Sequence, residues 1–184
     1  FGWADYKFMV NAFLAVILIA PLMGILGTMA VNNKMAFFSD ALGHSAFTAC
    51  HNLTTVVLPE GLTVINSGTF DDCEKLSEIE IPSSVTEIGN SAFACCDSIV
   101  NIELPENLTT LGGKSFAACI NLESIAIPDS VTTIGSGAFV NCPNLANITI
   151  GKGVSSIGSQ AFAYNTKAVF NIDENNANYS SSTD

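Results

Sequence analysis

The chain has 184 residues, of which 48% are hydrophobic and only 12% are charged, and its formal net charge is -11. An acidic chain without a single arginine is poorly suited to the phosphate backbone, so we exclude nucleic acid as a partner. The hydrophobic fraction excludes a chain that is disordered throughout. The charge is unevenly divided, because the first 50 residues sum to zero and residues 51–184 carry 15 carboxylates against four lysines.

The first predicted element is one transmembrane α-helix at about residues 8–31. The whole stretch between Lys7 and Lys34 carries no charge, and Asn11 and Thr28 are the polar side chains within 8–31. At about 1.5 Å per residue this helix would be ~36 Å long, which is enough for the ~30 Å hydrocarbon core of a bilayer. Because one lysine flanks each end, the orientation in the membrane stays open.

Two other interpretations of this segment are a cleaved secretory signal and a buried core helix. Thr28, Met29 and Ala30 fit a small-x-small cleavage site, but the apolar run exceeds the roughly 7–15 residues of a signal peptide. A core helix would need packing partners that the rest of the chain does not offer. We therefore expect residues 1–46 to form a membrane segment.

The same segment resembles a known family. The run Trp-Ala-Asp-Tyr-Lys-Phe-Met-Val-Asn-Ala-Phe-Leu-Ala-Val at 3–16 is similar to the first transmembrane helix of bacterial zinc/manganese ABC transporter permeases. Residues 32–46 are similar to the loop and second-helix start of that family. The resemblance covers residues 3–47 and implies an ABC ATPase and permease subunits as partners. A single helix cannot enclose a pathway, so the resemblance implies descent rather than transport.

From Phe47 onward the sequence repeats with a fixed 23-residue period. Apolar residues at two-residue spacing, such as Ile79 and Ile81, predict a short half-buried strand in each copy, which a proline ends. No copy can bury its apolar face alone, so the copies are expected to stack around one continuous core. Two of the recurring series are Phe47, Phe70, Phe93, Phe116, Phe139 and Phe162, and Cys50, Cys73, Cys96, Cys119 and Cys142.

The consensus Leu-x-x-Ile-x-Ile-Pro-x-x-Val-x-x-Ile-Gly-x-x-Ala-Phe-x-x-Cys resembles the BspA-like leucine-rich repeat, over residues 42–165. The resemblance implies a β-rich leucine-rich-repeat solenoid of parallel strands, in a family of surface and secreted proteins associated with adhesion and host contact. We expect the solenoid at 47–170, with five full copies and a decayed sixth, because Asn171 and Asp173 occupy isoleucine positions. The Asn- and Ser-rich residues 171–184 predict a disordered tail.

The cysteines and histidines form no recognisable catalytic or metal-binding pattern. Five of the six cysteines share one repeat position, which predicts buried thiols that behave as small apolar side chains. The sequence has no Cys-x-x-Cys pair, and neither His44 nor His51 has a recognisable triad partner. We therefore predict no enzymatic activity, no metal site and no cofactor.

Recognition is expected at the outward positions of the strands. With Val56 and Leu58 inward, side-chain alternation places their neighbours on the surface. Glu78, Glu80 and Glu103 then form an acidic patch that is solvated or bridged by a cation, and we favour the solvated state. The ten candidate binding residues are Thr55, Val57, Glu78, Glu80, Asn101, Glu103, Ser124, Ala126, Asn147 and Thr149.

Residues 42–47 belong to both patterns, since they fit the permease-like loop and also align with the repeat at 88–93. A fusion of two unrelated genes at a shared motif is the simplest account, either through natural recombination or as an assembly artefact. We expect a membrane-tethered interaction module in a bacterial cell envelope, with extracellular repeats, the lipid bilayer at residues 8–31, and a protein or glycan ligand. The alternative is a truncated permease component that takes part in zinc or manganese transport.

Overall fold

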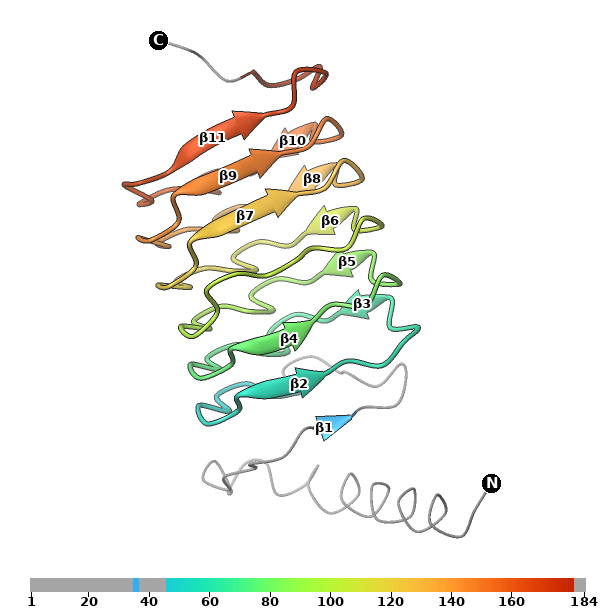
Figure 1. The fold of residues 1–184 in the computed structure, drawn as a ribbon, viewed down its shortest axis with the longest axis vertical. Coiled ribbons are helices and arrows are strands. Elements are labelled where there is room, and N and C mark those ends of the chain that lie inside the picture. The colour runs from blue at the N-terminus through green and yellow to red at the C-terminus, as the bar shows by residue number, and fades with distance from the viewer. Residues whose placement is uncertain (1–34, 37–45, 181–184) are drawn as a thin grey trace, which may run out of the picture. The chain divides into compact units, whose positions relative to one another are not determined.

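The structure is a computed structural model that describes residues 35–36 and 46–180. These residues belong to one compact unit, residues 31–184. Each pairing between its strands is parallel, and the chain winds as a solenoid (Figure 1). Within the described ranges no helix has the length and hydrophobicity that a bilayer crossing requires. The helix predicted at 8–31 lies outside those ranges.

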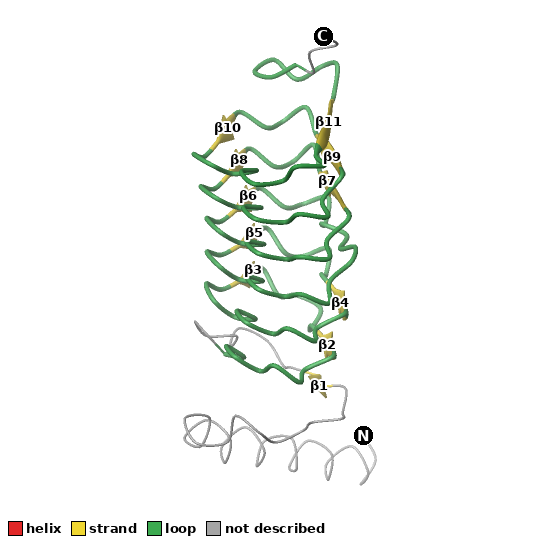
Figure 2. Ribbon diagram, turned by 90° about the vertical axis from the view of Figure 1, so that its left-hand side faces the viewer, coloured by secondary structure: helices red, strands yellow, loops and turns green. Residues whose placement is uncertain are grey.

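The strands stack on two sides of the solenoid (Figure 2). The front side carries β1 (Met35–Ala36), β2 (Thr55–Val57), β4 (Glu78–Glu80), β7 (Ser124–Ile127), β9 (Asn147–Ile150) and β11 (Val169–Ile172). The other side carries one five-stranded back sheet of β3 (Val64–Ile65), β5 (Glu87–Ile88), β6 (Thr110–Leu111), β8 (Thr133–Ile134) and β10 (Ser156–Ile157).

The repeat period sets the register of the back sheet. Glu87 pairs with Thr110, which in turn pairs with Thr133, so each residue lies beside its equivalent in the next copy. One copy therefore makes one turn of the solenoid, and the apolar positions of successive copies fall on top of one another. The predicted parallel solenoid of about five turns is confirmed.

Phenylalanine and cysteine form two stacked columns inside the solenoid. Successive rings from Phe47 to Phe162 are stacked with centroids 5.1–5.5 Å apart, and Phe70, Phe93 and their next two equivalents are fully buried. Each buried thiol donates a hydrogen bond to the carbonyl oxygen of the phenylalanine in the preceding copy, at 3.1–3.2 Å. The four thiols that do so are those of Cys73, Cys96, Cys119 and Cys142.

These contacts explain why the cysteines are structural. All six are free thiols, and burial raises the pKa of Cys73 to about 12 and that of Cys142 to about 11. Burial also raises the pKa of Cys96 and Cys119 far above its usual range. A thiol with so high a pKa stays protonated and is a poor nucleophile or metal ligand. The prediction of buried thiols is confirmed for these four positions, whereas Cys50, the first of the series, is half-buried.

The back sheet is reinforced by a hydroxyl column and a glycine column. The hydroxyl of Thr109 donates to the backbone oxygen of Thr86 at 2.9 Å, and three equivalent hydroxyls make the same bond at 3.2–3.3 Å. This column joins successive copies of the repeat. Just after the strands, a Cβ on Gly135 would lie 2.4 Å from a backbone nitrogen of the previous copy, so only glycine fits.

The front side is interrupted in the third copy, in contrast to the back sheet. Between β4 and β7, residues 101–104 form no extended strand, and Asn101 makes a single bridge to Ser124. The interruption separates a sheet of β1, β2 and β4 from a sheet of β7, β9 and β11. It falls where Glu80 and Glu103 would be cross-strand neighbours, a position at which like charges are unfavourable.

The sixth copy differs from its prediction, which placed polar Asn171 and Asp173 at the inward positions. Val169 pairs with Asn147. The regular period of 23 residues would instead pair Asn147 with Phe170, so the sixth copy is shorter by one residue. The shift brings Phe170 and Ile172 beside Ile148 and Ile150, and the copy gains a strand because apolar residues take the inward positions.

Residues 171–180 also correct the predicted disordered tail. Asn171 and Ile172 belong to β11, and the amide of Asn176 donates to the backbone oxygens of Gly151 at 2.9 Å and Val154 at 3.2 Å. Tyr179 packs partly buried against the core. The asparagines bond to carbonyl groups at the end of the fifth copy, which gives this segment a defined place. Residues 181–184 lie outside the described ranges.

Candidate interaction face

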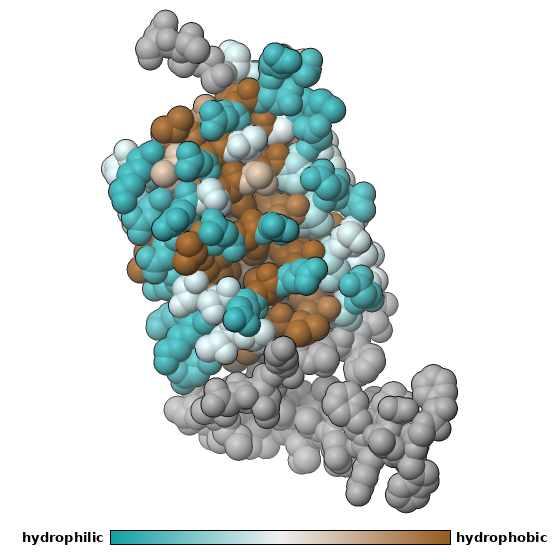
Figure 3. All heavy atoms as spheres, in the orientation of Figure 1, coloured by the Kyte–Doolittle hydropathy of each residue, from teal (hydrophilic) through white to brown (hydrophobic). Residues whose placement is uncertain are grey.

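The candidate binding residues lie on what we call the front face, the outward side of β2, β4, residues 101–103, β7 and β9 with β11 beside them. On the segments that carry the candidates, side chains alternate: Val56, Ile102 and Ile148 are buried, and eight of the ten candidates are exposed. Thr55 and Ser124 are half-buried. Hydrophilic and hydrophobic residues lie side by side on this side of the molecule (Figure 3).

The first half of the front face carries the predicted acidic patch. The strand register places Thr55 beside Glu78 and Val57 beside Glu80, and the Thr55 hydroxyl donates to Glu78 Oε2 at 3.1 Å. Val57 is 46% exposed, which leaves an apolar side chain next to the carboxylates. Among the described residues, neither these glutamates nor Glu103 forms a salt bridge.

The second half of the front face is neutral. Ser124 lies beside Asn147, and Ala126 lies beside Thr149, which also pairs with Asn171 of β11. The Ser124 hydroxyl donates to Asn101 Oδ1 at 2.8 Å. The structure thus brings Ser124, Ala126, Asn147 and Thr149 together on β7 and β9. The interruption at residues 101–104 separates them from Thr55, Val57, Glu78 and Glu80.

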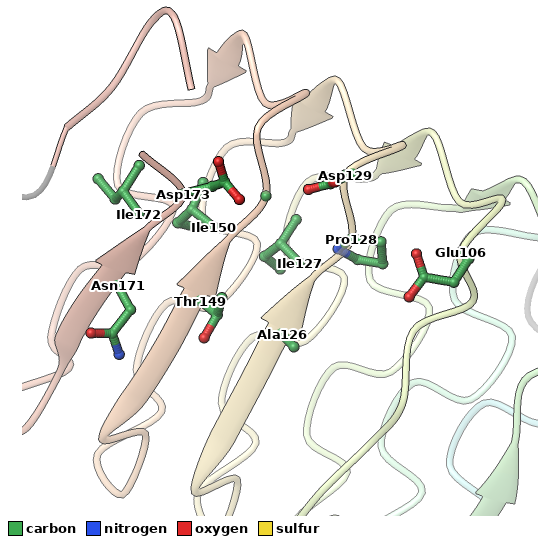
Figure 4. A pocket seen from close by; sticks show the side chains of 11 residues that line it. Glu106, Ala126, Ile127, Pro128, Asp129, Thr149, Ile150, Asn171, Ile172 and Asp173 are labelled. Atoms are coloured by element: carbon green, nitrogen blue, oxygen red, sulfur yellow. The ribbon is translucent and has the colours of Figure 1, made fainter. Parts of the chain in front are cut away.

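A shallow hollow of about 480 Å³ lies at the ends of β7, β9 and β11. Figure 4 shows the row of Ala126, Thr149 and Asn171 that lines it, with Asp129 and Asp173 at the ends of the strands. Small side chains at Ala126 and Thr149 leave this space open. The rest of the lining comes from Glu106, Ile127, Pro128, Ile150, Gly151 and Ile172.

The three carboxylates of the hollow differ in their partners. The Lys152 ammonium lies 2.8 Å from Asp129 Oδ2, and its hydrogen bond lowers the pKa of that carboxyl. Asp173 accepts the backbone N–H of Asn175 at 2.8 Å. In the part of the chain that is described, Glu106 and Asp173 form no salt bridge. The hollow therefore presents hydroxyl, amide and carboxylate groups on a small apolar floor, a mixture that suits hydrogen-bonding ligands.

Sequence reasoning predicted Ala126 and Thr149 of this hollow but missed the charged residues around them. Glu106 and Asp129 directly follow Pro105 and Pro128, and Lys152 is the next equivalent in the series. A comparison of the residue after the proline across copies would have shown this charged column. The size of the hollow also depends on the shortened sixth copy, which the regular period concealed.

Solved structures of leucine-rich repeat proteins are similar to this chain. The Treponema pallidum (T. pallidum) leucine-rich repeat protein is 33% identical, with a TM-score of 0.68, and the match covers 76% of this chain and 61% of that one. A leucine-rich cell surface protein from Faecalibacterium prausnitzii is 27% identical, with a TM-score of 0.63 over 76% of this chain and 47% of that one. This chain thus spans roughly half to three-fifths of their length.

Two family models match the chain, and no curated protein does. Residues 5–51 match the ABC 3 transport family, and residues 40–169 match the BspA type leucine-rich repeat region in six copies. The two matches overlap at residues 40–51, around the motif that fits both patterns. The repeat match covers well over half of the chain, whereas the permease match covers about a quarter. The chain belongs to the BspA-type leucine-rich repeat family, whose members are typically non-enzymatic.

Proposed function

We propose that this chain is a membrane-tethered interaction module that displays its repeats outside a bacterial cell and binds a protein or glycan ligand through the front face. The observation that carries the proposal is the contrast between positions within each copy. Inward positions repeat the same apolar types, whereas the exposed positions change from Glu78 and Glu80 to Ala126 and Thr149. Stacking does not require that change, so the varied positions are free to serve recognition.

The hollow is the proposed centre of binding. Its Thr149 hydroxyl, Asn171 amide and Glu106 carboxylate can each hydrogen-bond to a peptide backbone or to sugar hydroxyls. The acidic half of the face adds the carboxylates of Glu78 and Glu80, which would attract basic groups of a partner and speed its association. The cell surface protein among the similar structures supports the proposed location.

The experiment is adhesion of bacteria that express the full chain to cultured epithelial cells. Thr149→Arg fills the hollow with a long cation, and we expect it to reduce adhesion at least about tenfold, equivalent to about 1.4 kcal/mol. Ser156→Arg is the control, because that side chain is exposed in β10 of the back sheet. Equal adhesion by Thr149→Arg and the parent chain, or repeats that protease cannot reach on intact bacteria, would contradict the proposal.

The match of residues 5–51 to the ABC 3 transport family favours a second candidate, a permease component of a zinc or manganese transporter. Complementation of a permease-deficient strain distinguishes the transport role from the interaction module. Rescue of metal uptake by this chain in a permease-deficient strain would support the transport role against the interaction module. A DNA read that spans codons 40–55 would show that both parts belong to one gene, and a break there would separate them.

A further inference from the structure

A cluster of metal-ligand side chains lies at the corner that precedes β2 and β4, away from the hollow. His51 Nδ1 lies 3.4 Å from Glu74 Oε1 and 3.7 Å from Asp72 Oδ2. One donor atom from each of the three residues lies within 4.8 Å of the other two. Tetrahedral ligand atoms at about 2.0–2.2 Å from a metal lie roughly 3.3–3.6 Å apart, which is close to the two distances from His51 Nδ1.

The solenoid itself builds this cluster. His51 and Glu74 are separated by one full repeat, so they occupy the same position in successive copies, and Asp97 is the next member of that column. Asp72 belongs to the neighbouring column, where its backbone is left-handed with φ of 65°. The next equivalent of Asp72 is Cys95, and the later copies carry Ile120, Pro143, Ala118 and Asn141 in the two columns, which offer no imidazole or carboxylate. The ligand types are thus confined to the first three copies.

The local charge is also suited to a cation. Two further carboxyl groups, those of Asp71 and Asp97, lie close enough to Asp72 and Glu74 to interact with them electrostatically. No lysine forms a salt bridge with these carboxylates in the described part of the chain. Lys75 instead donates to Asn52 Oδ1 at 2.8 Å. The corner therefore holds more negative charge than its own side chains neutralise.

We infer that His51, Asp72 and Glu74 form a binding site for one divalent transition-metal ion, of which Zn²⁺ is the best match. Zinc accepts both imidazole nitrogen and carboxylate oxygen as ligands, whereas calcium prefers oxygen ligands throughout. Three protein ligands leave further positions for water. The ion would join the first two copies of the solenoid at their corner, independently of any ligand on the front face.

The test is calorimetric titration of the metal-free full chain with Zn²⁺. We expect saturable binding of one ion at His51, Asp72 and Glu74, and a thermal unfolding temperature that rises with Zn²⁺. His51→Ala and Asp72→Asn should each weaken binding at least about tenfold, since even the loss of an outer-shell partner costs about 10- to 100-fold. Asparagine tolerates the left-handed backbone, so Asp72→Asn preserves the fold.

The matched control is Glu87→Gln, which removes one exposed carboxylate from the back sheet and should leave zinc binding unchanged. The inference is overturned if His51→Ala and Asp72→Asn bind zinc as tightly as the parent chain, or if the parent shows no saturable binding at about 1 mM Zn²⁺.

Discussion

The back sheet and the front face are built by the same copies, yet one is continuous and the other is interrupted. In the back sheet, five strands pair without a break from β3 to β10. In four successive copies a side-chain hydroxyl at the same position donates to a backbone oxygen of the previous copy. Glycine occupies the position at which the backbones of neighbouring copies approach most closely. On the front face, pairing stops between β4 and β7, where Glu80 and Glu103 would be neighbours.

The difference shows which side-chain positions stabilise the stacking of the copies. Where a side chain makes the same contact in each copy, as Thr86 and Thr109 do, a change would break that contact with the neighbouring copy. The outward positions of the front strands make few such contacts, so Glu80, Glu103 and Ala126 can differ at equivalent places. Regular stacking and recognition are thus assigned to different sides of one solenoid.

The largest expected effect comes from the glycine column of the back sheet. In Gly135→Val, the new Cβ would lie 2.4 Å from the Gly113 nitrogen, and backbone of two copies would have to separate. We expect a loss of more than about 3 kcal/mol of unfolding free energy, measured by urea denaturation. Gly137→Asn is the control, because Gly137 has φ of +64°, within the left-handed region that asparagine tolerates, and a Cβ there would meet its nearest atoms at an ordinary 3.4 Å. Parent-like stability of Gly135→Val would disprove the close approach.

Stability should be nearly as sensitive to substitution of the inward-facing residues of the front side as it is to substitution in the glycine column. Ile102 is 7% exposed, so Ile102→Asp buries a carboxylate without a partner and should cost about 3–4 kcal/mol. The conservative Ile102→Val should cost only about 1 kcal/mol. Thermal unfolding of both variants measures the difference. An aspartate variant that unfolds at the parent temperature would show that Ile102 does not face the core.

The buried thiols predict that stability falls at alkaline pH. The fold raises the pKa of Cys73 to about 12 and of Cys142 to about 11, above about 8.5 in the unfolded chain. Their contribution is complete below pH ~8.5 and is lost as the pH rises toward 11–12, because the unfolded chain then binds fewer protons. At pH ~10 the loss should reach about 1–2 kcal/mol per thiol.

Urea denaturation between pH 8 and pH 10 measures this loss, and the double variant Cys73→Ala with Cys142→Ala supplies the comparison. Alanine removes the two titrations while other groups stay the same, so its stability should fall less steeply with pH. Identical slopes for the parent and the double variant would show that these thiols titrate normally in the fold.

The smallest expected effect concerns the interruption itself. Glu103→Thr removes the like charge opposite Glu80 and introduces a residue with high strand propensity, so it should add about 0.5 kcal/mol. Slower amide hydrogen exchange at residues 101–104 would report the restored pairing. The same change in the back sheet, Glu87→Thr, should leave that exchange unaltered. If both variants exchange alike at 101–104, charge repulsion does not cause the interruption.

The repeat made much of this fold predictable. The spacing of Val56, Leu58 and their equivalents predicted which side chains face inward, and the structure shows that Val56 and Leu58 are buried. The prediction was possible because a buried position tolerates only apolar side chains. The shift by one position in the sixth copy was not predictable from the period, since Phe170 and Ile172 reach their places by shortening a turn. To identify the charged column around the hollow and the cluster at His51 from the sequence, one would have to compare the residues that occupy the same repeat position in successive copies.

The most direct test of the central claim is a matched charge reversal within one copy. Glu80 and Glu87 are both exposed, but Glu80 lies on the front face and Glu87 lies in the back sheet. We would measure adhesion to epithelial cells by bacteria that express Glu80→Lys or Glu87→Lys. Our account predicts that Glu80→Lys reduces adhesion severalfold while Glu87→Lys leaves it at the parent level. An equal loss in both variants, or a loss in Glu87→Lys alone, would contradict recognition by the front face.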